Sequence, residues 1–139
     1  MTSSLDNLVR IGQLNAEPPA QVEIDGLIRS GLARLADADN FSNSIYGRFD
    51  LAYNAAHALS LAALRWRGYR SDNRYLVFQT LIHTLDLPNE QWRVLDTAHT
   101  KRSLAEYEGV ADVDEELVAA MIRVVREIAA RVAKLGPIK

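Results

Sequence analysis

The sequence contains no cysteine among its 139 residues, and this absence excludes disulfide bonds and zinc sites built on thiolates. It also lacks any apolar run near the roughly 20 residues that a membrane-spanning helix needs, and its first residues lack the basic start and apolar run of a secretory signal. The formal net charge of −2 gives no overall attraction to nucleic acid, so any RNA contact would need a local basic patch. We therefore expect a cytoplasmic protein without membrane contact.

The usual sequence signatures of cofactor and metal sites are also missing. The chain has no glycine-rich phosphate loop, no Walker pattern and no Gly-x-Ser-x-Gly elbow. Its three histidines, His57, His83 and His99, show no spacing of four residues that would place two of them on one helical face as metal ligands. The sequence thus predicts no cofactor and no metal.

What is present is enough apolar material for one core, since 48% of the residues are hydrophobic. We expect a single domain over residues 1–139, with a short N-terminal helix and a proline-containing linker over 1–18 and the core over 20–135. Helical periodicity runs throughout, and no alternating strand pattern competes with it. The predicted fold class is therefore all-α, an up-and-down bundle of five to six helices.

Caps, prolines and glycines divide the helical pattern. They predict a short helix after Ser3 or Ser4, then helices from Pro18-Pro19 to about Ala38, from Ser42 or Ser44 to Gly68, from about Arg74 to Leu85, from Pro88 to Gly109, and from about Asp112 to Gly136-Pro137. The third of these is apolar on nearly every side between Phe49 and Leu64 and rich in alanine, so we expect it to be central. The last has apolar residues every three or four positions from Leu117 to Leu135, which predicts one buried stripe.

Polar side chains interrupt the apolar face of the fifth predicted helix. With 100° per residue and Leu95 as reference, Ala98, Arg102 and Ala105 fall in one arc, and His99 and Glu106 lie at its edge. If this face is exposed, Arg102 and Glu106 form a helical ion pair worth about 0.3 to 0.5 kcal/mol. If another subunit covers it, the arginine is desolvated and must be paired or serve a ligand.

The same face has the groups for phosphate chemistry. An arginine stabilises charge on a phosphate while a histidine or tyrosine moves a proton. Cleavage of RNA by its own 2′-hydroxyl needs this combination of groups and no metal. We therefore name Arg102, Tyr107 and His99 as catalytic candidates. The candidate ligand-binding residues are Arg102, Ser103, Glu106, Lys101 and Arg70. Arg70 belongs with Arg65, Arg67 and Arg74 to a cluster that suits either phosphates or the C-terminal dipole of the third helix.

Three segments carry a resemblance to a known family: Arg48-Phe-Asp-Leu-Ala-Tyr-Asn-Ala-Ala-His57, Arg67-Gly-Tyr-Arg70 and Lys101-Arg-Ser-Leu-Ala-Glu-Tyr-Glu-Gly109. Together they resemble the HEPN superfamily of helical bundles, which occur in toxin–antitoxin systems and beside nucleotidyltransferases. Active HEPN ribonucleases have Arg, a polar residue that is usually Asn, three variable residues and then His. Here Arg102 matches the Arg, Ser103 replaces the Asn, and Tyr107 stands in place of the His, so the Arg-x4-His motif is degenerate.

The resemblance implies a homodimer that pairs through this helix, and a nucleotidyltransferase or antitoxin as a partner. Three functions remain open. The one we favour is a non-catalytic HEPN-like module that binds a nucleotide, RNA or a partner protein through a cleft around Arg102. The second is a metal-independent endoribonuclease that uses Arg102 with Tyr107 or with His99, since tyrosine, with a pKa of about 10, is a weaker base than histidine. The third is a purely structural homodimeric interaction module.

Overall fold

The computed structural model describes residues 3–109 and 112–138. Both ends of the predicted domain 1–139, and positions 110–111 of the predicted core 20–135, lie outside the described residues. The elements are α1 (Ser4–Arg10), β1 (Asn15–Ala16), α2 (Gln21–Ala38), α3 (Ile45–Trp66), β2 (Tyr69–Arg70), α4 (Arg74–Gln79), α5 (Leu81–Thr84), α6 (Asn89–Glu108) and α7 (Glu115–Ala133).

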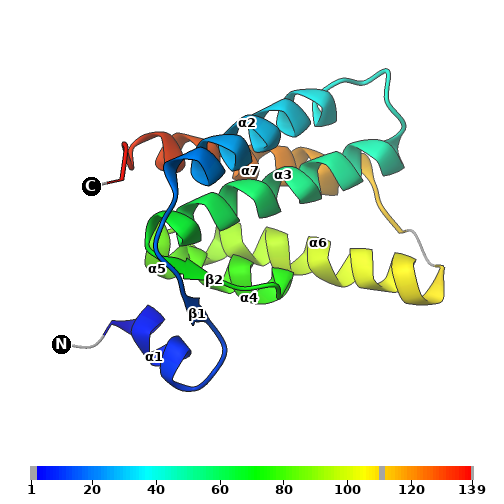
Figure 1. Ribbon diagram of the computed structural model, residues 1–139. Coiled ribbons are helices and arrows are strands. Elements are labelled where there is room, and N and C mark those ends of the chain that lie inside the picture. The colour runs from blue at the N-terminus through cyan, green and yellow to red at the C-terminus, as the bar shows by residue number, and fades with distance from the viewer. Residues whose placement is uncertain (1–2, 110–111, 139) are drawn as a thin grey trace.

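The predicted all-α bundle is confirmed. Figure 1 shows the long helices α2, α3, α6 and α7 lying roughly side by side and alternating in direction along the chain. Local capping explains where several of them begin: the side chains of Ser3, Ser44 and Asp114 each accept a hydrogen bond from a backbone N–H in the first turn. Gly109, in the left-handed conformation with φ 69°, ends α6 as expected.

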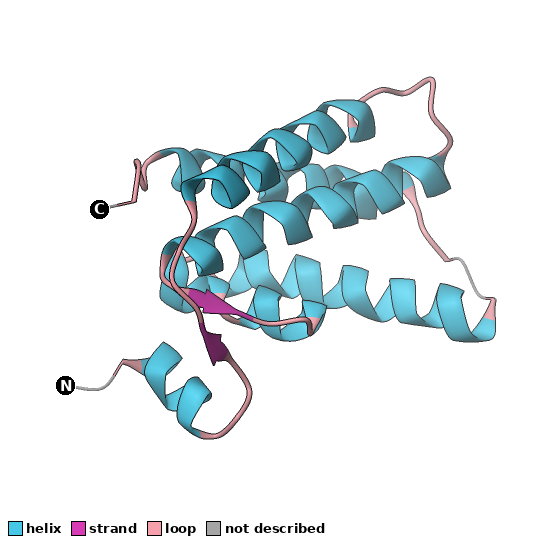
Figure 2. Cartoon of the chain, viewed as in Figure 1, coloured by secondary structure: helices cyan, strands magenta, loops and turns pink. Residues whose placement is uncertain are grey.

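Three details differ from the sequence-based expectation. The helix predicted from Arg74 to Leu85 is two short helices, α4 and α5, separated at Thr80, whose hydroxyl donates to the carbonyl of Val77. The last helix is capped by Asp114 and not by Asp112. A two-stranded antiparallel pair, which pairs Asn15 with Arg70 and Ala16 with Tyr69, was not predicted, because strands of two residues are too short to show alternation (Figure 2).

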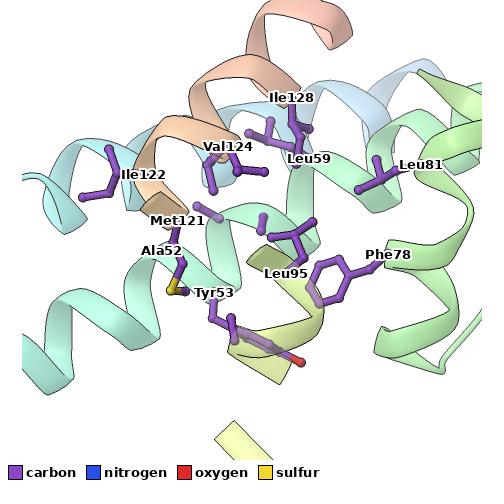
Figure 3. Close-up of a cluster of buried hydrophobic side chains, with 14 of the residues drawn as sticks. Ala52, Tyr53, Leu59, Phe78, Leu81, Leu95, Met121, Ile122, Val124 and Ile128 are labelled. Atoms are coloured by element: carbon purple, nitrogen blue, oxygen red, sulfur yellow. The ribbon is translucent and has the colours of Figure 1, made fainter. Parts of the chain in front are cut away.

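The prediction that the third helix is central is confirmed, since α3 packs against α2, α4, α5, α6 and α7. Its alanines at positions 52, 55, 56, 62 and 63 are completely buried, and their small side chains let neighbouring helices approach closely. The main core combines Ala52, Ala55, Ala56 and Ala63 with residues of α4 to α7 such as Phe78, Leu95, Met121 and Ile128 (Figure 3). The buried stripe predicted for α7 is also confirmed, with Met121, Val124, Ile128 and Val132 buried.

The N-terminal segment packs on the outside of this bundle. A second, smaller apolar cluster joins Leu5 and Leu14 to Leu64, Leu76 and Val77 of α3 and α4. The strand pair lies next to it and ties residues 15–16 to the chain that follows α3 (Figure 2). Within the described ranges, no helix is long and apolar enough to cross a membrane.

Candidate functional site

The face of α6 that the sequence singled out does turn inward. Leu95 and Ala98 are buried, and one helical turn later Arg102 is partly buried against α3. Its guanidinium carbon lies 4.5 Å from the centroid of the Tyr53 ring. This is cation–π geometry, in which a positive charge is attracted to the electron-rich face of an aromatic ring.

The polar side of Arg102 has no partner within residues 3–109 and 112–138. Its Nη1 is shielded from solvent and makes no hydrogen bond there. The ion pair with Glu106 expected for an exposed helix face is likewise absent from these residues, although Glu106 is exposed and close enough to influence Tyr53. Packing within the chain thus desolvates Arg102 in part, and no carboxylate of the described residues forms an ion pair with it. The alternative in which another subunit covers this face stays a prediction.

His99 reaches the same tyrosine from one turn earlier. Its Nδ1 lies 2.9 Å from the Tyr53 hydroxyl, and the direction of this hydrogen bond follows the imidazole tautomer. Desolvation lowers the pKa of His99, and burial raises the pKa of Tyr53. Both side chains are therefore neutral near pH 7, and Arg102 carries the positive charge of the group.

Two residues of α4 complete the surroundings. The ring centroid of Tyr75 lies 4.9 Å from that of His99, and the Tyr75 hydroxyl donates to Oδ1 of Asp96 at 2.8 Å, a hydrogen bond that raises the pKa of Tyr75. Arg74 is 5.8 Å from the Tyr53 ring centroid, and its Nη1 donates to Oδ1 of Asn54 at 2.9 Å. Tyr53 is thus the centre of the cluster.

A surface pocket of about 330 Å³ opens beside this cluster. It is lined by Asp50, Asn54, Arg102, Ala105 and Glu106, which come from α3 and α6. Asp50 and Glu106 are exposed, so solvent screens their charges more than that of Arg102. The pocket therefore offers one partly desolvated cation, one amide and two carboxylates at its rim, a set that suits a ligand with both a phosphate and hydroxyl groups.

The structure separates the other predicted site residues from Arg102. Tyr107 is 83% exposed and takes no part in the Tyr53 cluster. Lys101 pairs with Asp112, its Nζ 2.9 Å from Oδ2. Arg70 pairs with Glu17 and Glu23 in a different cluster around Arg65. Ser103 is partly buried next to Arg102 in sequence, and Glu106 lines the pocket.

Sequence reasoning missed Tyr53 and Asn54 as site residues. Tyr53 is separated from His99 by 46 positions, so no local spacing connects them. The available signals were the polarity of Asn54 within an alanine-rich apolar helix and the place of both residues in the segment 48–57 of the family resemblance. Arg74 was recognised as part of a basic cluster, but the cluster does not hold together in the fold: Arg65 and Arg70 bind carboxylates, whereas Arg74 joins Tyr53.

The remaining histidines do not form a metal site. His57 is largely buried, and its ring packs edge-on against Phe78. Burial, with the charges of Arg74 and Arg102, lowers its pKa to about 4. Among the described residues, no group of three or more histidine, aspartate and glutamate side chains is arranged to hold a metal ion.

Comparison with known proteins gives no match: no family model, no curated protein and no solved structure is similar to this chain. The resemblance to HEPN domains thus stays a prediction. Any function must be argued from the geometry around Arg102, because function belongs to the site and not to the fold.

Proposed function

We propose that this chain is a HEPN-like binding module whose pocket at Arg102 takes a phosphate group of a nucleotide or of RNA. The observation that carries the proposal is the Nη1 of Arg102, which is buried and has no hydrogen-bond partner among the described residues. An unsatisfied buried donor costs about 1 to 3 kcal/mol, more on a charged group, and an incoming acceptor removes that cost. A planar guanidinium also matches phosphate oxygens with two parallel hydrogen bonds.

The way Arg102 is held supports this use. Its contact with Tyr53 is through the ring face, at 4.5 Å, and no hydrogen bond within the described residues fixes the orientation of its N–H groups. The guanidinium can therefore turn toward an anion in the pocket without breaking a hydrogen bond. Tyr53 keeps the charge in place, and the neutral His99 adds no repulsion to a phosphate.

The pocket rim favours a nucleotide over free phosphate. Asp50 and Glu106 line the same pocket as Arg102, and their carboxylates accept hydrogen bonds from hydroxyl groups. A ribose offers such hydroxyls a short distance from its phosphate, whereas inorganic phosphate has none to offer. This supports Glu106 as a ligand-binding residue beside Arg102.

The test compares Arg102→Gln with a matched control, Arg123→Gln. Arg123 is an exposed arginine of α7, so both variants lose one positive charge. Fluorescence anisotropy with a labelled single-stranded RNA, and calorimetry with AMP, measure the dissociation constants. We expect Arg102→Gln to weaken binding at least about tenfold, as the loss of a charge-assisted hydrogen bond implies, and Arg123→Gln to remain within about twofold of the wild type. Equal affinities of the wild type and Arg102→Gln, or no binding by the wild type, would contradict the proposal.

One observation favours ribonuclease activity as a second candidate. His99 and Arg102 share the Tyr53 ring, and the lowered pKa of His99 keeps it in the neutral form that a general base needs. Tyr107 is too exposed to take that role beside Arg102. Wild-type protein that cleaves the same RNA probe in EDTA, with cleavage lost in Arg102→Gln, would support this candidate. RNA that stays intact with the wild type would contradict it and leave binding as the only proposed function.

A further inference from the structure

A second guanidinium converges on the ring that holds Arg102. The guanidinium carbon of Arg74, on α4, lies 5.8 Å from the Tyr53 centroid, and that of Arg102, on α6, lies 4.5 Å from it. The positive charges of both arginines act on the pKa values of Tyr53 and His57 in the same direction. Two like charges from different helices thus lie next to the same aromatic ring of α3.

The other arginines that are not exposed differ from Arg74 and Arg102 in that they form ion pairs. Each of them pairs with one or more glutamates: Arg48 with Glu115, Arg65 and Arg70 with Glu17 and Glu23, and Arg131 with Glu127. Arg74 and Arg102 form no ion pair within residues 3–109 and 112–138. Since an arginine removed from water normally takes an anionic partner, the missing partner of these two is expected to come from outside the chain.

Asn54 connects the two guanidiniums. Its Oδ1 accepts the hydrogen bond from Nη1 of Arg74 at 2.9 Å, and the same side chain lines the pocket together with Arg102. A neutral amide is a weaker partner for a guanidinium than a charged oxygen. An anion bound in the pocket next to Asn54 can therefore take over the N–H groups of Arg74 while it binds Arg102.

We propose that Arg74 is a second phosphate-binding residue, and that Arg74 and Arg102 grip one phosphate group from two sides beside Asn54. This inference rests on the proposed function, because Asn54, which accepts the hydrogen bond from Arg74, lines the pocket at Arg102. It assigns α4 a direct part in recognition. A phosphate between Arg74 and Arg102 also offsets the mutual repulsion of their positive charges, because it attracts both.

The experiment is a double-mutant cycle with Arg74→Gln, Arg102→Gln and the double variant, measured with the labelled RNA and with AMP. If both arginines hold one phosphate, each single change weakens binding about tenfold or more, and the double variant loses clearly less than the product of the two losses. Arg74→Lys, which keeps the charge without the planar fork, should recover only part of the affinity. Arg123→Gln again serves as the control for charge.

The outcomes separate this inference from the proposed function. Unchanged affinity in Arg74→Gln, with binding lost in Arg102→Gln, overturns the role of Arg74 and leaves the Arg102 site intact. Losses that multiply in the double variant overturn the shared phosphate. Unchanged affinity in both single variants overturns the proposed function itself. Thermal unfolding checks that each protein is folded, and if Arg74→Gln fails to fold, wild-type affinity in Arg74→Lys overturns the inference, since the lysine lacks the fork.

Discussion

Tyr53 serves the core and the candidate site with different parts of one side chain. It is 1% exposed, and its ring packs edge-on against Phe78 with the centroids 5.5 Å apart. Figure 3 shows it at the margin of the apolar cluster, with its hydroxyl oxygen directed away from the labelled aliphatic side chains. That hydroxyl meets His99, and the ring face carries Arg102. Packing of the core therefore fixes the position of the proposed ligand-binding arginine.

His57, whose pKa responds to Arg74 and Arg102, makes the free energy of unfolding depend on pH. Its folded-state pKa is about 4, lowered from 6.5 chiefly by burial and further by the charges of Arg74 and Arg102. Between these two pH values the unfolded chain binds a proton that the folded protein excludes. The free energy of unfolding therefore falls as the pH drops from about 6.5 to about 4, and this loss levels off below that range.

We expect His57→Gln to remove this component of acid destabilisation. From pH 7 to about pH 4.5, the stability of the variant relative to the wild type should rise by about 1 to 3 kcal/mol, measured by urea unfolding at each pH. Carboxylates with lowered pKa values, such as Asp6 and Glu23, also titrate at acidic pH, but they are common to both proteins and cancel in the difference. Parallel pH profiles of the two proteins would show that His57 is not responsible.

At the scale of elements, α2 and α3 pack tightly against each other at a glycine. A Cβ added to Gly31 of α2 would lie 2.7 Å from Cγ and 2.9 Å from Cδ2 of Leu59 on α3. At Gly26, one face away on the same helix, the nearest atom to an added Cβ is Nη2 of Arg29, at 3.9 Å. The same substitution therefore clashes with a packed side chain at one position and makes an ordinary van der Waals contact at the other.

Alanine substitutions at these two glycines should have opposite effects on stability. Gly26→Ala should raise the free energy of unfolding by about 0.5 to 1 kcal/mol, because alanine is the better helix former. Gly31→Ala should lower it by about 1 kcal/mol or more, because overpacking against Leu59 exceeds that gain. Urea denaturation measures both, and a stabilised Gly31→Ala protein would show that Leu59 can move aside.

The elements also show where sequence patterns stop being sufficient. Helix ends were predictable at Ser44 and Gly109, since a cap or a left-handed glycine acts within one turn of chain. The break at Thr80 was not, because residues 74–85 contain neither proline nor glycine. The inward turn of Arg102 followed from helical periodicity. Whether its Nη1 finds a hydrogen-bond partner among the described residues depends instead on which groups α3 and α4 present to it.

For the whole molecule, Arg65 joins the N-terminal segment to the bundle. It is 1% exposed, and its guanidinium binds Glu23 (Nε to Oε1, 2.6 Å) and donates to the carbonyls of Glu17, Pro18 and Tyr69. These partners come from the segment before α2, from α2 and from β2. One buried side chain thus holds the strand pair and the linker against the end of α3.

We expect Arg65→Met to lower the free energy of unfolding by about 3 kcal/mol or more, because several partly buried acceptors lose a buried, charged donor at once. Arg126→Met is the matched control. Arg126 pairs with Asp39 at the surface, where both side chains are about half exposed, so its loss should amount to about 1 kcal/mol or less. Urea unfolding gives both values, and exchange of the Glu17 amide, which donates to the carbonyl of Gly68 at 2.9 Å, should accelerate only in Arg65→Met. Similar losses in the two variants would mean that Arg65 does not anchor the segment.

By itself the sequence determined the helical fold class, most helix boundaries and the inward position of Arg102, because caps and the 3.6-residue period act between residues close along the chain. Only the tertiary structure decided which charged groups find a partner among the described residues. Tyr53, Arg74 and Arg102 lie on three helices, and only the packing of those helices brings them together. The β1–β2 pair and the neutralisation of Arg65 and Arg70 likewise join residues about 50 positions apart. Pairing of charges is set by distance in space, and distance along the chain carries little information about it.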